Sequence, residues 1–377
     1  MTEAVAGARI IFENVTKRYG NGPAAVTDLS LDIAPGEVCV LVGPSGCGKT
    51  TTMKLINRLV EPTSGRITID GQDVAALPAV ELRRRIGYVI QQVGLFPHLT
   101  VGANVAVVPR LLGWPAMRTA ARAEELLALV GLDPATYRDR YPAALSGGER
   151  QRVGVARAIA ADPPILLMDE PFGAVDPIGR ERLQNEFLRL QAVLRKTIVF
   201  VTHDVDEAIK MADRVAILNT GGVLAQYAAP DELLAHPASP FVEHFVGADR
   251  GLKRLSLARV GGLSLEPAPV VRVGEARATA RARLADGTAW RLVTDADDRP
   301  LGWMPAPDLA GDGPLTVEDA GPGLATVEPE STLRDALSAM LASSVQQGVV
   351  VDDRGRVLGV VSVDAISAVL GTEGARS

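Results

Sequence analysis

The feature that most constrains the fold of this 377-residue chain is a glycine-rich segment that directly follows a short apolar run. The run occupies residues 38–42 and reads VCVLV, which is typical of a strand buried on both faces of a sheet. The next segment fits the pattern G-x-x-x-x-G-K-[ST] and opens a predicted helix. Its residues are Gly43, Pro44, Ser45, Gly46, Cys47, Gly48, Lys49 and Thr50. This strand–loop–helix unit predicts an α/β fold of the P-loop NTPase class, with a phosphate-binding loop (the phosphate loop, residues 43–50).

The phosphate loop needs these residue types for a physical reason. Glycines let backbone N–H groups curl around phosphate oxygens, and the N-terminus of the following helix adds favourable partial charge. Lys49 would supply a point charge to the outer phosphates, and Thr50 would offer a hydroxyl to Mg²⁺. We also count Thr51 among the expected nucleotide contacts. A glycine-rich turn that matches by chance is the alternative, but it does not account for strand, loop and helix together.

The rest of the first two-thirds of the chain alternates apolar runs with helical patterns. Residues 165–168 (ILLM) and 197–201 (TIVFV) resemble the run at 38–42. Between them, Leu183, Phe187, Leu190 and Leu194 recur at helical spacing and predict one apolar stripe. Together with an apolar fraction of 47%, this pattern predicts a largely parallel sheet with helices.

Two adjacent carboxylates, Asp169 and Glu170, end the apolar run at 165–168. A carboxylate at the end of a buried strand is well placed to hold Mg²⁺, and Glu170 could polarise an attacking water. An acidic pair that caps a helix after Pro171 is the alternative. Beside a phosphate loop, the metal and water roles are the favoured hypothesis.

Residues 145–152 read LSGGERQR. Ser146 would cap a helix, while Gly147 and Gly148 would expose backbone N–H groups to an anion. An ordinary helix cap would have the same geometry. This stretch, however, resembles the signature motif of the ATP-binding subunits of ABC transporters. The resemblance implies that residues 146–149, including Glu149, contact nucleotide, and that a helical subdomain interrupts the α/β core.

Other motifs of that family fall in order around the signature. Tyr19 matches an aromatic residue that stacks on adenine, and Gln91 matches a glutamine that touches Mg²⁺ and faces the membrane partner. Gln92 is adjacent, so this assignment could differ by one residue. Asp176 matches an aspartate of the subunit contact, and His203 matches a histidine that contacts the γ-phosphate. Taken singly, a surface tyrosine, a loop glutamine or a structural histidine would be the simpler interpretation.

The resemblance also implies partners. Two copies would pack head to tail, so that Ser146 and Gly148 of one copy face the ATP of the other. The pair would bind integral membrane permease subunits. Through the permease it would work with an extracytoplasmic solute-binding protein. We expect a peripheral position on the cytoplasmic side of the membrane, since no signal peptide or spanning segment is evident. The net charge of −6 gives no indication of nucleic-acid binding.

Several stretches resemble one branch, the osmoprotectant importers for glycine betaine, carnitine, choline and proline-like solutes. They are residues 12–19 (FENVTKRY), 53–62 (MKLINRLVEP), 84–97 (RRIGYVIQQVGLFP) and 197–208 (TIVFVTHDVDEA). An importer of the same build for another amino-acid-like solute is the alternative. A soluble ABC ATPase of DNA repair or translation ranks lower, because this chain has one phosphate loop and no heptad run. A module that only binds nucleotide is disfavoured by Glu170 and His203.

The composition changes after residue 247, where we place the boundary between an ABC domain (1–247) and a second domain (248–377). In the second domain, DRPLG at 298–302 resembles DRGRVLG at 353–359, and residues 332–343 are expected to be helical, with Leu333, Leu337 and Leu341 on one side. The repeat resembles the tandem CBS modules of the branch, with a degenerate first copy and a second copy at about 322–370. In the family, such modules sense ionic strength or a nucleotide.

Two features bear on what the second domain would sense. Asp364 lies one position earlier than the usual nucleotide-holding pattern places its aspartate, which argues against ordinary adenine-nucleotide binding. Residues 250–291 carry nine Lys or Arg against three acidic residues. We hypothesise that this basic stretch meets anionic lipid or an acidic surface. A solvated face is the alternative.

Overall fold

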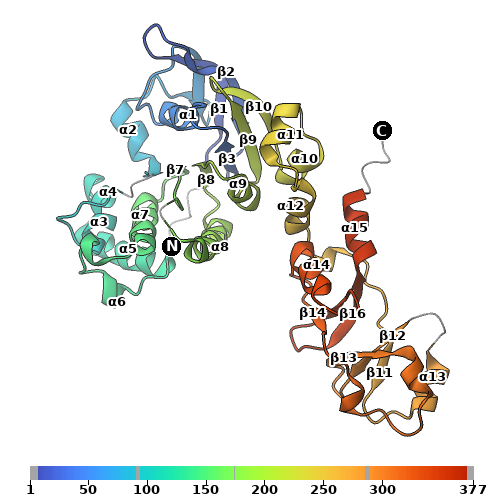
Figure 1. Ribbon diagram of the computed structural model, residues 1–377. Coiled ribbons are helices and arrows are strands. Elements are labelled where there is room, and N and C mark those ends of the chain that lie inside the picture. Colours follow the sequence, from blue (N-terminus) through green and yellow to red (C-terminus); the bar gives the residue numbers. More distant parts are fainter. Residues whose placement is uncertain (1–6, 91–93, 174, 285–288, 372–377) are drawn as a thin grey trace. The chain divides into compact units, whose positions relative to one another are not determined.

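The computed structural model describes residues 7–90, 94–173, 175–284 and 289–371, and the chain divides into two compact units (Figure 1). The first unit spans Met1–Val246 and the second spans Gly247–Ser377. Each unit has its own hydrophobic core and is described by itself. Within the described residues, no helix combines the length and the apolar character needed to cross a membrane.

A six-stranded sheet forms the centre of the first unit. In spatial order its strands are β10 (Val223–Ala228), β9 (Arg214–Asn219), β3 (Val38–Val42), β8 (Thr197–Val201), β7 (Ile165–Asp169) and β6 (Ile86–Val89). Neighbouring strands are parallel except for the β9–β10 pair at one edge. Strands β3, β7 and β8 are buried along their whole length, which explains their apolar sequences. The predicted parallel sheet is confirmed.

A second sheet was not predicted. Its strands are, in spatial order, β2 (Ala24–Ile33), β1 (Ile10–Arg18), β4 (Ser64–Ile69) and β5 (Gln72–Asp73), and all neighbours are antiparallel. Register shifts interrupt the β1–β2 and β1–β4 ladders, so polar and apolar positions do not alternate cleanly along the sequence. Apolar side chains from both sheets share one core, which includes Phe12, Leu29, Leu41 and Val199.

The helices of the first unit fall into two groups (Figure 1). One group accompanies the sheets and consists of α1 (Lys49–Ile56), α2 (Ala79–Arg84), α8 (Pro177–Leu194), α9 (Val205–Met211), α10 (Pro230–Ala235) and α11 (Pro240–Val246). The other is the expected helical subdomain, which lies between β6 and β7 in the chain. It consists of α3 (Val101–Val105), α4 (Val107–Leu111), α5 (Ala116–Leu129), α6 (Pro134–Tyr137), the 3-10 helix η1 (Pro142–Ala144) and α7 (Gly147–Ile159). Helix α7 packs against α3 and α5.

Two three-stranded sheets of the same design form the second unit. The first contains β11 (Val270–Arg272), β12 (Trp290–Thr294) and β13 (Pro300–Pro305), and the second contains β14 (Ala325–Val327), β15 (Gln347–Val351) and β16 (Val357–Ser362). In each sheet the first two strands are parallel and the last two antiparallel. Val293 pairs with Gly302, and 57 positions later Val350 pairs with Gly359. The repeat noted in the sequence therefore extends to strand register.

The turn between the two antiparallel strands is repeated as well. Asp295 Oδ1 accepts hydrogen bonds from the backbone N–H groups two and four residues later, at 2.9 and 2.8 Å. Asp352, again 57 positions on, does the same at 3.0 and 2.8 Å. The expected degeneracy of the first copy thus lies in its side chains and helix, and not in its strands.

The two sheets differ in the helices beside them. The second sheet packs with α12 (Arg250–Leu257), α14 (Leu333–Leu341) and α15 (Val363–Gly371), whereas the first has α13 (Arg277–Arg283). The 3-10 helices of this unit are η2 (Val260–Gly262), η3 (Ala306–Ala310) and η4 (Val317–Asp319). The expected stripe on α14 is partly wrong: Leu333, Ala336 and Met340 are buried, but Leu341 is 63% exposed.

The basic stretch at 250–291 is largely engaged in bonds within the second unit. Ion pairs join Arg272 to Asp298 at 2.7 Å, Arg277 to Asp319 at 2.5 Å, Arg283 to Glu275 at 3.0 Å and Lys253 to Asp249 at 3.2 Å. Arg291 is also buried. The positive charge available to a partner is therefore smaller than the residue count suggests.

Candidate active site

Three neighbouring strands bring the predicted site residues of the first unit to one edge of the parallel sheet. Strand β8 lies between β3 and β7, and all three run in the same direction. Their carboxyl ends therefore lead into the phosphate loop, His203 and Glu170 side by side. Glu170 N donates to Val201 O at 2.9 Å, which ties the end of β7 to that of β8. This is the edge where ligands bind in open α/β sheets.

The phosphate loop has a conformation that two of its glycines make possible. Gly43 has φ +155° and Gly48 has φ +106°, both outside the range that other residues adopt readily. A Cβ on Gly48 would lie 2.2 Å from Ala25 O, and one on Gly43 would lie 2.2 Å from Leu218 O. Gly48 also precedes the first turn of α1. Any other residue at these positions would both strain the loop and collide with backbone.

Lys49 is held inside the loop that it was predicted to serve. Its Nζ donates to Gly43 O at 2.7 Å and to Pro44 O at 3.0 Å, and the residue is 8% exposed. Cys47, at 1% exposed, lies beside it, with Sγ 3.8 Å from Nζ. A buried ammonium bonded to neutral carbonyls is poised to exchange one of them for a phosphate oxygen, which compensates its charge better.

Thr50 and Asp169 meet across the sheet edge. Thr50 Oγ1 donates to Asp169 Oδ1 at 3.4 Å. Burial raises the pKa of Asp169, and the neighbouring Glu170 charge raises it further, while Thr50 and two lysines oppose the rise. A hydroxyl and a carboxylate are the hard oxygen ligands that Mg²⁺ prefers. Among the described residues, no group of three or more His, Cys, Asp or Glu side chains that could hold a metal occurs.

Glu170 and His203 face each other at the mouth of the site. His203 Nδ1 lies 3.2 Å from Glu170 Oε1, and the two side chains are 65% and 24% exposed. Glu170 has φ +45°, a left-handed conformation that is uncommon for residues with a β-carbon. Backbone strain of this kind is found at functional sites, where the surrounding structure holds it in place.

Ser146 caps α7 as predicted, but Glu149 is engaged in the same cap. Glu149 N donates to Ser146 Oγ at 3.3 Å, and Ser146 N donates to Glu149 Oε2 at 2.7 Å, forming a reciprocal capping box. Tyr137 OH donates to Glu149 Oε1 at 2.6 Å and is the main cause of the lowered pKa of Glu149. Sequence reasoning missed Tyr137. These described contacts of Glu149 lie within the cap and with Tyr137, and the predicted nucleotide contacts of residues 146–149 stay predictions.

The capped end of α7 opens into a hollow that it shares with the start of α8. Asp176 caps α8, where its Oδ1 accepts from Gly179 N at 2.9 Å. The hollow is lined by Ser146, Gly147, Gly148, Glu149, Tyr137, Arg152, Val175, Asp176 and others. Within the described residues, the hydrogen bonds of Lys49 stay within the phosphate loop and do not reach this group. The predicted residues therefore form two sets on one subunit, the strand-end set and the α7–α8 set.

Comparison with known proteins decides the family. The ABC transporter family matches residues 26–173, and the CBS domain family matches residues 317–371. The osmoprotectant import ATP-binding protein OsmV of Salmonella typhimurium is 46% identical over 364 residues, which cover 95% of each chain. The chain belongs to the ATP-binding subunits of ABC-type osmoprotectant importers.

Further matches agree with this family. The glycine betaine/carnitine/choline transport ATP-binding protein OpuCA of Bacillus subtilis is 46% identical over 360 residues, 93% of both chains. A bacterial ABC transporter cassette solved as a dimer gives a TM-score of 0.53 at 35% identity and covers 59% of this chain and 98% of that one. A cassette in a post-hydrolysis state with ADP and phosphate gives 0.53 at 34% identity, with the same coverage. This ABC subunit is an ATP-hydrolysing enzyme.

The remaining predicted contacts of this ABC subunit lie apart from the two sets or outside the described residues. Tyr19 is 52% exposed just after β1, and Lys17 Nζ lies 5.0 Å from the centre of its ring. Thr51 lies in the first turn of α1 and is partly buried. Gln91 falls outside the described residues, so its predicted metal and nucleotide roles stay predictions.

Sequence reasoning missed a buried polar pair that joins α8 to α9. Gln184 of α8 donates to Glu207 Oε1 of α9 at 3.0 Å, and both residues are almost fully buried. Burial raises the pKa of Glu207, while hydrogen bonds with Thr202 and Gln184 oppose the rise. Thr202 directly precedes His203. The available signal was a glutamine within the apolar stripe of α8, where an unpaired amide would be costly.

Proposed function

We propose that this ABC subunit hydrolyses MgATP at the phosphate loop as one half of a head-to-tail homodimer on the cytoplasmic face of the membrane. Hydrolysis would drive import of a quaternary-ammonium or related osmoprotectant. The observation that carries the proposal is the convergence of three strand ends on Lys49, the Thr50–Asp169 pair and the Glu170–His203 pair. This arrangement supplies a cation for phosphate, oxygen ligands and a base at one edge.

Each side chain of the strand-end set has a separate role in the proposal. Lys49 binds the outer phosphates, and Thr50 and Asp169 hold Mg²⁺. When bound, the ion neutralises charge that develops on the phosphate oxygens. Glu170 orients the attacking water and accepts its proton, and His203, fixed by Glu170 Oε1, faces the γ-phosphate. Catalysis is then mostly positioning and charge stabilisation.

The second half of the site would come from another copy of the chain. Ser146, Gly147, Gly148 and Asp176 line a hollow at two capped helix ends, whose backbone N–H groups suit a phosphate. The dimeric cassette that resembles the first unit supports the same arrangement.

A groove between β6 and the helical subdomain supports a permease partner. It is lined by Arg83, Arg84, Ile86, Tyr88, Ile90, Phe96, Val107, Val108 and others. Ile90 is 37% exposed and Phe96 is 42% exposed, so apolar surface faces outward beside arginines. An amphipathic helix of the permease with acidic flanks would cover this surface, in the manner of helix-in-groove recognition. The solute-binding protein would act through that permease.

The choice of solute rests on the relatives that match the whole chain. OsmV and OpuCA cover both units, and their names specify osmoprotectant, glycine betaine, carnitine and choline. The first unit alone does not discriminate, since an Fe(3+) ions import protein of Brucella abortus is 46% identical over 244 residues. Import of another amino-acid-like solute is the second candidate. Uptake by the complete transporter in proteoliposomes, with glycine betaine and proline compared, would decide between them.

We also propose that residues 248–377 regulate transport as a tandem CBS-like domain. The CBS match at residues 317–371 and the repeated sheets support this. The ligand would be anionic lipid or a nucleotide, although ion pairs occupy much of the basic stretch. Uptake measured with and without anionic lipid, across a range of salt, would separate the two. A response to neither lipid, salt nor nucleotide would contradict a regulatory role.

The ATPase proposal is tested by Glu170→Gln. Loss of the base should lower ATP hydrolysis by about a thousandfold. Fluorescent-nucleotide binding should persist, and MgATP should drive dimer formation in light scattering. Glu181→Gln is the matched control, because Glu181 is 74% exposed on α8 and lies outside the site. Full hydrolysis by Glu170→Gln would assign the base to another residue.

A further inference from the structure

The helix that begins at the phosphate loop ends at an arginine in an unfavourable backbone conformation. Helix α1 runs from Lys49 to Ile56, and Arg58 follows with φ +51°. Glycine adopts this left-handed region easily, whereas a residue with a β-carbon is disfavoured there. Such a backbone conformation persists only where the surrounding contacts hold it in place. The contacts of the Arg58 guanidinium are therefore informative.

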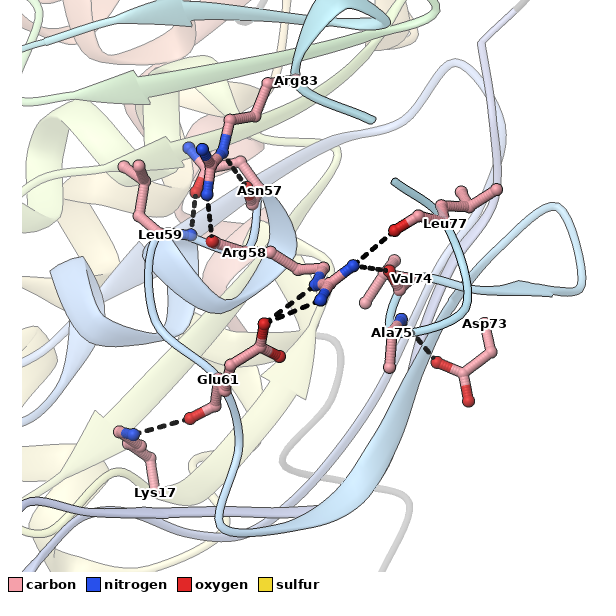
Figure 2. Close-up of polar contacts among 10 residues, drawn as sticks. All are labelled: Lys17, Asn57, Arg58, Leu59, Glu61, Asp73, Val74, Ala75, Leu77 and Arg83. Atoms are coloured by element: carbon pink, nitrogen blue, oxygen red, sulfur yellow. Dashed lines mark hydrogen bonds and ion pairs between the residues drawn. The ribbon is translucent and has the colours of Figure 1, made fainter. Parts of the chain in front are cut away.

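The Arg58 guanidinium ties the end of α1 to the segment after β5. Its Nη1 donates to Val74 O at 3.0 Å and to Leu77 O at 2.5 Å (Figure 2). Its Nε and Nη2 both donate to Glu61 Oε1, at 3.1 and 2.8 Å. The Arg58 side chain is 16% exposed. The planar fork of the guanidinium holds these acceptors in a fixed geometry, which a lysine could not reproduce.

A second arginine, Arg83, donates hydrogen bonds to backbone carbonyls at the same end of α1. Arg83, on α2, donates from Nε to Asn57 O at 3.1 Å and from Nη2 to Arg58 O at 2.5 Å (Figure 2). These carbonyls follow the last turn of α1, where a cation also complements the helix dipole. Arg83 at the same time lines the groove beside β6. We call Arg58, Glu61 and Arg83 the arginine clamp.

The clamp is also connected to Tyr19, the residue predicted to stack on the adenine base. Lys17 Nζ donates to Glu61 O at 2.6 Å (Figure 2), and the same ammonium lies 5.0 Å from the ring centre of Tyr19. The two ends of the expected nucleotide thus connect to one polar cluster. The phosphate end connects through α1, and the base end connects through Lys17.

We propose that the arginine clamp is a positioning device that passes movement of α1 on nucleotide binding to the groove-lining segment at residues 74–90. Continuous hydrogen bonds connect the two, and both guanidinium groups bond to backbone carbonyls that must move with their elements. The clamp acts through α1. This role rests on the proposed function insofar as the groove receives the permease.

The first test concerns the chain alone and does not depend on the permease. Hydrogen exchange would be followed in the full chain, in a Glu170→Gln background, with and without MgATP. With an intact clamp, MgATP should slow exchange in both residues 43–56 and residues 74–90. Arg58→Gly relieves the backbone strain while it removes the guanidinium. It should keep protection at 43–56 and lose it at 74–90.

The controls separate the clamp from general damage. Arg84→Ala changes the next residue of α2, which lines the same groove but has no hydrogen bond to Asn57 or Arg58 in the described chain. It should behave like the parent. Arg58→Lys keeps the charge without the fork and should resemble Arg58→Gly. Equal protection of both segments in Arg58→Gly would overturn the proposal, and so would loss of protection in Arg84→Ala alone.

The second test uses the complete transporter in proteoliposomes with glycine betaine. Arg58→Gly should lower the number of solute molecules imported per ATP hydrolysed by about tenfold. Its KM for ATP and the ATPase rate of the free subunit should stay within about twofold of wild type. An unchanged coupling ratio would overturn the clamp. A wild-type complex that hydrolyses ATP without solute stimulation would instead contradict the proposed function, and the exchange experiment would still judge the clamp.

Discussion

Asp169 in the first unit and Asp352 in the second both lie at the end of a strand, but their pKa values are shifted in opposite directions. Asp169 ends β7, and Asp352 directly follows β15. Burial raises the pKa of Asp169, whose one described side-chain bond is the long contact with Thr50 at 3.4 Å. Hydrogen bonds lower the pKa of Asp352, which accepts from two backbone N–H groups and from Arg356 Nε at 2.8 Å.

The difference separates a carboxylate that serves a ligand from one that serves the fold. A mostly buried carboxylate with few donors costs stability, and a bound cation would remove that cost. A carboxylate surrounded by donors has no capacity left for a ligand and stabilises its turn. The hydrogen-bond environment, and not the position at a strand end, distinguishes the two, and the following changes test this distinction.

The largest effect is expected for Asp169→Asn. Loss of the metal-binding charge should lower MgATP hydrolysis by about a hundredfold. The same change should raise the thermal unfolding temperature of the nucleotide-free chain at neutral pH, because the buried charge is removed. Asp231→Asn, an exposed change on α10, is the control for both assays. A lower unfolding temperature for Asp169→Asn would show that this carboxylate stabilises the fold.

Asp352→Ala should have the opposite profile. The turn between β15 and β16 would lose two backbone hydrogen bonds and the Arg356 ion pair, so exchange of the β15 and β16 amides should accelerate. ATP hydrolysis by the first unit should stay at the wild-type rate. A loss of hydrolysis larger than the loss of folded protein would contradict this separation of roles.

Asp295→Ala should have a smaller effect of the same kind. Its carboxylate makes the matching backbone bonds in the first copy, so we expect about 1 kcal/mol less stability. Amide exchange in β12 and β13 would report it. If Asp295→Ala destabilised the chain more than Asp352→Ala, the additional ion pair of Asp352 with Arg356 would contribute nothing to stability.

The pH dependence should distinguish the two carboxylates most finely. The pKa of Asp352 is lower in the folded state, so its stabilisation is complete above the unfolded value and is lost as pH falls through the folded value. The pKa of Asp169 is higher in the folded state, so its destabilising effect vanishes at low pH and grows as pH rises past the unfolded value. Below about pH 4, acid should therefore weaken the β15–β16 turn in wild type and have less effect in Asp352→Ala. Amide exchange at β15 and β16 would measure the difference.

Sequence patterns predicted those parts of the fold where burial is uniform. The apolar runs at 38–42, 165–168 and 197–201 became β3, β7 and β8 because parallel strands with two buried faces tolerate little else. The sheet of β1, β2, β4 and β5 was missed because its ladders shift register. On α14 the helix and the burial of Leu333 were predicted, but Met340 lies in the core where Leu341 was expected.

The candidate site was predictable in its residue types and not in its contacts. The spacing of the phosphate loop and the position of Asp169 after a strand follow from sequence. The division into two sets does not, because it depends on how α7 and α8 are placed in space. Glu149 of the capping box also accepts from Tyr137, 12 positions earlier, and no local pattern signals this pairing.

The turn that recurs 57 positions apart also indicates where the second unit can accept extra residues. The constant offset from Asp295 to Gly302 means that the hairpin has the same length in both copies. The segment between the first two strands, by contrast, is one residue longer in the second copy. Val271 pairs with Val293 in the first copy, and Val327 pairs with Val350 in the second. The two copies thus differ in length around the helix and agree in length in the hairpin. A peptide spliced between the first two strands should accordingly be accepted, whereas the same peptide in the hairpin should not.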